Sequence, residues 1–120
     1  MKRTGSTNYI WRRTIRILRK VAKNNDARTW RYIAELLEKP RRKRIAVNIS
    51  KISRYSRDGD IIVVPGKVLG VGSINHRITV VAMSFSKQAV RKVKGAGGRV
   101  VHILEFLNEN PKGSRVKVII

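Results

Sequence analysis

Cysteine is absent from this chain of 120 residues, and several kinds of chemistry are excluded with it. Without a thiol the chain has no disulfide, no thiolate metal ligand and no cysteine nucleophile. Histidine is scarce as well, since only His76 and His102 occur. Two histidines cannot form a multi-histidine metal cage. We therefore expect no metal site.

Long apolar runs are also lacking. No stretch approaches the ~18 apolar residues of a membrane-spanning helix. The first residues, Met-Lys-Arg, are basic but lead into polar residues, whereas a signal peptide needs an unbroken apolar run there. We expect a soluble, cytoplasmic protein with no membrane partner.

Acidic residues are few: Asp and Glu number 7 against 28 Lys and Arg, which gives a net charge of +21. Such an excess in a small volume repels itself, and a polyanion such as a nucleic acid would relieve the repulsion. The chain is not a disordered basic tail, because 42% of its residues are hydrophobic and can form a core.

The length fits one domain over 1–120. The residue pattern predicts a basic arm and two helices in 1–44 and an α/β body in 45–120. The first helix covers 8–23. The second covers 27–38, with Asp26 as its N-cap and Pro40 closing it. Trp11 and Trp30 lie on the inner faces, so we interpret them as core residues and not as base-stacking platforms.

In residues 45–120 the spacing between apolar residues becomes shorter than in the helices. This indicates short strands and a mixed α/β fold. We expect a strand at 61–64 ended by Pro65 and Gly66, and two further strands at 67–71 and 78–85 joined by a hairpin-like connection at 72–76. Ser86 should cap a helix that runs to about residue 94. Further strands are predicted at 45–49, 99–103 and 116–120, and helical turns at 50–55 and 104–108.

The sequence offers little to catalysis or to a nucleotide cofactor. The glycines at 66, 70 and 72 match neither a Walker loop nor a dinucleotide fingerprint, and tight turns explain them. No serine lies in a Gly-x-Ser-x-Gly elbow. We predict a protein that is not an enzyme, has no cofactor and takes no small-molecule substrate.

The basic arc of the first helix is the feature that most strongly indicates nucleic-acid binding. Placed at 100° per residue, its basic side chains gather opposite the apolar face, and no acid occurs between Arg12 and Lys23. A solvated helix face or a membrane-surface helix is the alternative, but a solvated face normally mixes both signs of charge. The run at 41–44 is a second candidate, with a localisation signal or a plain linker as its alternative. The tip at 72–77 could equally probe an RNA groove or touch nothing. The candidate RNA-binding residues are Lys2, Arg3, Arg12, Arg13, Arg16, Arg19, Lys20, Lys23, Arg41, Arg42, Lys43, Arg44, Arg54, Arg57, Lys67, His76 and Arg77.

Five segments of the body are similar to a known family. They read VNISKISRY from residue 47, GDIIVVPGKVLG from 59, HRITV from 76, AMSFS from 82 and AGG from 96. Together they resemble the archaeal and eukaryotic large-subunit ribosomal protein eighteen family, the "e" type, which is related to bacterial large-subunit protein fifteen.

The resemblance implies a structural component of the large ribosomal subunit that binds large-subunit rRNA beside neighbouring ribosomal proteins. It also implies an irregular ββα-layered fold for 45–120, without catalysis or cofactor. Composition alone equally allows a DNA-compacting protein. A preference for structured rRNA over duplex DNA of equal length would separate the two.

Overall fold

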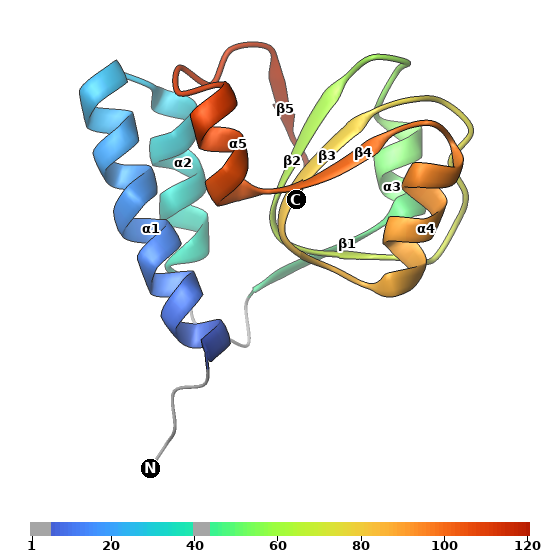
Figure 1. Ribbon diagram of the computed structural model, residues 1–120, viewed down its shortest axis with the longest axis horizontal. Coiled ribbons are helices and arrows are strands. Elements are labelled where there is room, and N and C mark those ends of the chain that lie inside the picture. The colour runs from blue at the N-terminus through green and yellow to red at the C-terminus, as the bar shows by residue number, and fades with distance from the viewer. Residues whose placement is uncertain (1–5, 40–43) are drawn as a thin grey trace.

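The computed structural model describes residues 6–39 and 44–120, in which helices and parallel strands are interspersed after an N-terminal helix pair. Figure 1 shows their arrangement. The helices are α1 (Ser6–Asn25), α2 (Arg28–Leu37), α3 (Ile49–Arg54), α4 (Lys87–Gly95) and α5 (Ile103–Glu109). The strands are β1 (Ile45–Asn48), β2 (Ile61–Leu69), β3 (Thr79–Phe85), β4 (Arg99–His102) and β5 (Val116–Val118). The mixed α/β class predicted from the sequence is confirmed.

The two N-terminal helices are joined by a reversal at Asp26. This residue has a left-handed backbone, with φ of 49°, and the Ala27 N–H donates to the Ala22 carbonyl at 2.9 Å. That bond is typical of a helix C-terminus in which the left-handed residue follows the last helical one. The predicted role of Asp26 as N-cap of the second helix is therefore wrong. Ala27 occupies that position without a side-chain cap bond.

The strands form a sheet in the order β1-β2-β3-β4, with β5 also paired to β2. All of these pairings are parallel. The predicted hairpin-like connection at 72–76 is therefore wrong: β3 runs parallel to β2, so the segment between them must return to the starting end of the sheet.

Strand β2 does not end at Pro65 and Gly66, as the sequence predicted, but continues through them to Leu69. Its pairing with β3 shifts register between Val64 and Lys67, and there the missing N–H of Pro65 is tolerated. On the edge of β2 that faces away from β3, the partner strand changes along the chain. It is β5 at Ile61–Val63 and β1 at Gly66–Leu69. Figure 1 shows β2 and β3 curving around α3 and α4.

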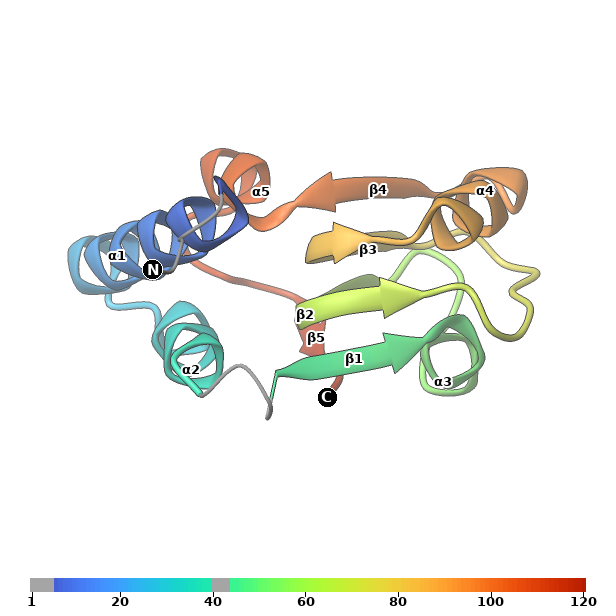
Figure 2. The same cartoon turned by 90° about the horizontal axis from the view of Figure 1, so that it is seen from below.

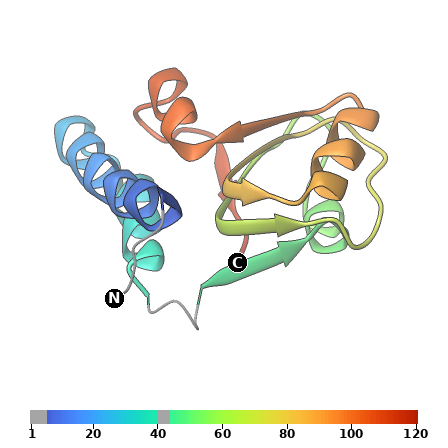
Figure 3. The same cartoon turned by 60° about the horizontal axis from the view of Figure 1, so that its bottom comes forward.

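Alternate side chains of the sheet enter two separate cores. One core joins Val63, Val81 and Val101 to helices α1, α2 and α5. The other joins Ile62, Val64, Val80 and Ala82 to α3 and α4. Figures 2 and 3 place α1, α2 and α5 at one end of the molecule and α3 and α4 at the other.

Several local predictions are confirmed. Trp11 and Trp30 are buried. Ser86 is the N-cap of α4, where its hydroxyl oxygen accepts the Ala89 N–H at 3.1 Å. None of the helices among the described residues is both long enough and apolar enough to span a membrane.

Candidate nucleic-acid interface

Helix α1 divides into a buried arc and a basic exposed arc. Trp11, Thr14, Leu18 and Ala22 are buried against α2, α5 and the sheet. The basic side chains of the helix are all exposed, and we call them the α1 basic face. They are Arg12, Arg13, Arg16, Arg19, Lys20 and Lys23.

The buried arc holds this face in place. The indole Nε1 of Trp11 donates to the Leu37 carbonyl at 2.8 Å, and the Thr14 hydroxyl donates to the Ile10 carbonyl at 2.7 Å. Both polar side chains on the inner arc are thereby satisfied. The Trp11 bond reaches from α1 to α2, so α1 cannot rotate about its axis without leaving these buried polar groups unpaired. The basic face is a fixed surface.

Charge on the α1 basic face is almost uncompensated. Helix α1 contains no acidic residue, and Arg19 forms an ion pair with Glu38 just beyond α2. Within residues 6–39 and 44–120, no other side chain of the face is ion-paired to a carboxylate. Like charges spaced four residues apart repel each other, so the face gains from an anionic partner.

Arg44 lies at the border between the helix pair and the sheet. Its guanidinium carbon is 3.9 Å from the centroid of the Trp11 ring, a cation–π contact with a core residue. Arg44 is half-buried by this packing. The predicted contacts Lys2, Arg3, Arg41, Arg42 and Lys43 lie outside the described residues.

A second group of predicted contacts surrounds the connection between β2 and β3. His76 is half-buried, and its Nε2 lies 2.8 Å from the Ser56 hydroxyl oxygen. Arg77 is exposed, and its backbone N–H donates to Asp58 Oδ1 at 2.8 Å. These bonds fasten the connection to the segment after α3. Arg54, the last residue of α3, and Arg57 in that segment are also exposed.

The connection is held from its other side by Lys92 of α4. The ammonium group of Lys92 donates to the Gly70 carbonyl at 2.6 Å and also to the Gly72 carbonyl. The Ser50 N–H donates to the Val71 carbonyl at 3.0 Å. The 70–77 connection is therefore built into the fold on both sides. We call its predicted contacts, with those at and just after the end of α3, the loop group: Arg54, Arg57, His76 and Arg77.

The structure does not bring all predicted contacts to one place. The α1 basic face and the loop group lie at opposite ends of the molecule (Figure 2). Lys67 is exposed on β2, paired in register with Ala46 on one side and Ser84 on the other. Any nucleic acid would meet these groups as separate surfaces.

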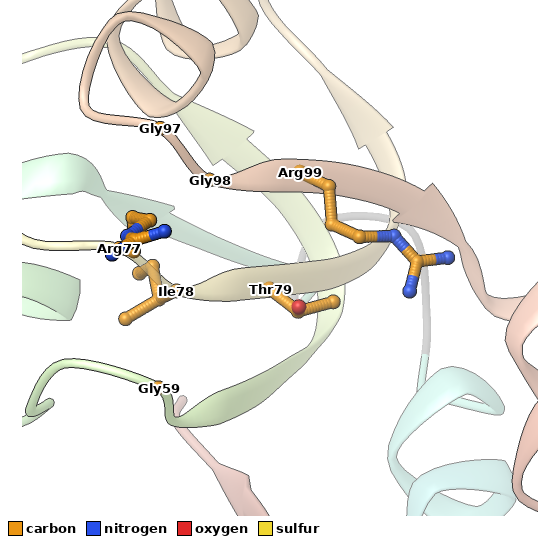
Figure 4. A pocket seen from close by; sticks show the side chains of 7 residues that line it. All are labelled: Gly59, Arg77, Ile78, Thr79, Gly97, Gly98 and Arg99. Carbon is orange, nitrogen blue, oxygen red and sulfur yellow. The ribbon is translucent and has the colours of Figure 1, made fainter.

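A hollow of about 230 Å³ lies where β3 and β4 begin (Figure 4). It is lined by Gly59, Arg77, Ile78, Thr79, Gly97, Gly98 and Arg99. The Arg99 guanidinium is held by both carboxylate oxygens of Glu109, at 3.1 and 2.7 Å, which raises the pKa of Arg99 and lowers that of Glu109. The lining has no carboxylate and no histidine, so it lacks a general base that could do acid–base chemistry or activate the Thr79 hydroxyl.

The described residues hold no cluster of His, Asp and Glu suited to a metal ion. Outside the hollow, Lys117 binds Asp60 Oδ2 at 2.9 Å, and together with the Arg57 N–H it lowers the pKa of Asp60. This carboxyl is thus engaged in fixing the turn before β2.

Basic residues of α4 were not predicted as contacts from the sequence. Lys87, Arg91 and Lys94 are exposed along this helix. Two signals could have found them: their spacing of four and three residues, and the absence of any Asp or Glu between Ile61 and Leu104.

Basic surfaces at both ends of a small parallel α/β fold, with neither a catalytic constellation nor a metal cluster in the described part of the chain, match the class of ribosomal proteins. A family model described as ribosomal proteins 50S-L15, 50S-L18e and 60S-L27A matches residues 30–101. The chain belongs to this family, which is one of ribosomal proteins and not of enzymes.

Relatives match along nearly the whole chain. Large ribosomal subunit protein eL18 of Pyrobaculum aerophilum is 47% identical over 117 residues, 98% of this chain and 96% of the relative. The eL18 of Methanococcus maripaludis is 44% identical and covers 99% of both chains. That of Sulfolobus acidocaldarius is 49% identical over 96% of both. The resemblance found in the sequence is confirmed.

Proposed function

We propose that this protein is a structural component of the large ribosomal subunit that binds folded large-subunit rRNA through phosphate contacts. Its relatives carry the name of large-subunit proteins, and the match covers nearly all of both chains. Neighbouring ribosomal proteins of that subunit are further partners under the same proposal.

The observation that carries the proposal is the α1 basic face. It is exposed, free of acid along the helix and held in one orientation by the Trp11 hydrogen bond to α2 and by the burial of the opposite arc. Such a face offers a fixed row of cationic donors to phosphate oxygens, which position a protein on RNA without reading its sequence.

The loop group supports a second contact area. His76 and Arg77 sit on a connection anchored by Ser56, Asp58 and Lys92, so little conformational entropy is lost when RNA binds there. On subunit assembly we expect both side chains to become protected from chemical modification. Unchanged reactivity of both would remove the loop group from the interface.

Salt dependence tests the phosphate contacts directly. The logarithm of affinity for an rRNA fragment should fall with the logarithm of salt concentration by about 0.7–0.9 per phosphate neutralised, with a total slope steeper than about −4. Replacing Arg12, Arg16 and Lys20 by Gln should flatten that slope. An affinity for rRNA that does not change with salt concentration would overturn the proposal.

A DNA-compacting protein is the competing function, and its test uses the same assay. Structured rRNA fragments should bind more tightly than duplex DNA of equal length at the same salt concentration. Equal or tighter binding to the DNA would favour compaction and contradict an rRNA scaffold.

A further inference from the structure

Helix α4 presents a second basic face, made of Lys87, Arg91 and Lys94. At 100° per residue these three fall within about 60° of arc, along one side of the helix. All three are exposed, and none is ion-paired to a carboxylate in the described part of the chain. The opposite side of α4 is buried through Ala89 and Val93.

The fold assigns the basic residues of α4 two different tasks. Lys92 turns towards the 70–77 connection and binds the carbonyls of Gly70 and Gly72, so its charge is used inside the molecule. Lys87, Arg91 and Lys94 have no such internal partner among the described residues. Their charge contributes repulsion to the free protein and attraction to an anion.

The surface between these charges is shaped as well as charged. Phe85 and Val90 line a hollow of about 410 Å³ together with Lys87, Arg91 and Lys94. Phe85 is half-buried and contributes to the wall of this hollow. A surface with cations beside an aromatic ring suits a nucleotide, whose phosphate meets the charges while its ribose or base meets the ring.

The α4 face and the α1 basic face lie at opposite ends of the molecule, whose longest extent is 39 Å (Figure 2). The sheet stands between them. A short RNA element seated on one face cannot reach the other.

We propose that α4 is an RNA-binding site in addition to the loop group, and that the protein bridges two separate RNA elements, one on the α1 basic face and one on Lys87, Arg91 and Lys94. This inference rests on the proposed function, which supplies the first element. When both elements belong to one rRNA chain, the binding of the first face makes the binding of the second intramolecular, and this raises the effective concentration of the second element. The protein thereby fixes the distance between RNA segments.

A capture assay with two RNA hairpins tests the bridge. Both hairpins are shorter than 39 Å, one is immobilised, and the other carries a fluorophore. The wild-type protein, as a monomer verified by sedimentation, should retain the fluorescent hairpin on the immobilised one. The variant Lys87→Gln, Arg91→Gln, Lys94→Gln should still bind a single hairpin but lose bridging by about tenfold or more.

The variant Arg12→Gln, Arg16→Gln, Lys20→Gln removes charge from the α1 basic face. It should likewise bind a single hairpin but lose bridging. A charge-matched control, Arg28→Gln, Lys112→Gln, Arg115→Gln, changes exposed residues that belong to neither face, and it should retain bridging. All variants should melt near the parent temperature, because the replaced side chains are exposed.

Several results would overturn the bridge. Full bridging by the α4 variant would show that α4 is not a site, and equal loss in the control would show that total charge alone is responsible. A wild-type protein that binds one hairpin but never two would refute the bridge and leave the proposed function standing, whereas no binding at all would refute the proposed function. If the α4 variant bridged normally but lost binding of a polyglutamate peptide, the face would belong to an acidic protein partner.

Discussion

Trp11 and Leu37 connect the two N-terminal helices by one hydrogen bond, 2.8 Å from the indole nitrogen to the backbone carbonyl. Leu37 is the last residue of α2, and its carbonyl is among those that a helix leaves without an internal partner. The guanidinium carbon of Arg44 lies over the same indole ring, 3.9 Å from its centroid. One side chain thus orders α1, the end of α2 and the entry to β1.

Replacing Trp11 by Phe should destabilise the protein by ~1–3 kcal/mol. Phenylalanine keeps an aromatic ring but cannot donate to Leu37, whose partly enclosed carbonyl is then left unpaired. Urea denaturation measures the change. Tyr9→Phe is the control, since Tyr9 is exposed, and it should leave the free energy of unfolding unchanged. Equal effects of the two variants would contradict the role of the Trp11 bond.

The two arcs of α1 should separate stability from RNA affinity. Leu18 is fully buried, so Leu18→Ala should lower the free energy of unfolding by ~2–5 kcal/mol. The variant Arg12→Gln, Arg16→Gln, Lys20→Gln should melt at or above the parent temperature, because it removes like-charge pairs worth ~0.2–0.5 kcal/mol each. Thermal melting and filter binding on the same samples measure both properties.

Arg19 stands apart from its neighbours on the α1 basic face because it pairs with Glu38. This pair is exposed on both sides, so Arg19→Gln should cost no more than ~1 kcal/mol. Charge variants of the other residues that melted much lower than the parent, with RNA affinity intact, would mean that the basic face is structural.

The helix pair could be predicted from the sequence because helical periodicity is local. Trp11 and Leu18 fall on one arc whatever the rest of the chain does, and both are buried in the structure. The direction of β3 could not be predicted in this way. Thr79 pairs with Ile61 because β3 runs parallel to β2. This pairing joins segments that are distant in the sequence, and the local pattern at 72–76 does not predict it.

The basic residues of α4 illustrate a second limit. Within the helix Lys92 and Arg91 are adjacent and chemically alike, yet Lys92 binds the Gly70 carbonyl and Arg91 is exposed. Helical periodicity turns Lys92 about 100° away from Arg91, towards the buried side of α4, but only the folded structure shows which carbonyls Lys92 binds. On α1 no basic residue lies on the buried arc, which is apolar apart from Thr14. Helical periodicity alone therefore predicts which basic residues of α1 are exposed.

Gly66 should be intolerant of any side chain. A Cβ at this position would lie 2.0 Å from the Ile45 carbonyl oxygen, where β1 joins β2. Gly66→Ala should therefore destabilise by at least ~1–3 kcal/mol, since the strands must move apart to admit the methyl group. Gly95→Ala is the matched control: nothing lies within 4 Å of its Cβ, and Ala in α4 should add up to ~1 kcal/mol of stability. Similar melting of the two variants would refute the close approach at Gly66.

His102 should make the stability depend on pH. It caps α5 by accepting the Leu104 N–H at Nδ1, 3.0 Å away, so this nitrogen carries no proton in the folded state. Burial lowers the pKa of the ring below its usual 6.5, and the Glu105 carboxylate opposes only part of that shift. As the pH falls below about 6.5, the unfolded chain takes up the proton first, so the free energy of unfolding should decrease until the folded pKa is reached.

Denaturation at a series of pH values in His102→Asn identifies the group responsible for that decrease. Asparagine supplies a side-chain oxygen that can cap α5 but does not titrate, so the variant should lose the decrease just below pH 6.5 and keep most of the stability measured at pH 7.5. His76→Asn removes the other histidine and should retain the decrease, because His102 is still present. A His102→Asn protein that weakened with falling pH as steeply as the parent would show that the histidine cap does not couple α5 to protonation.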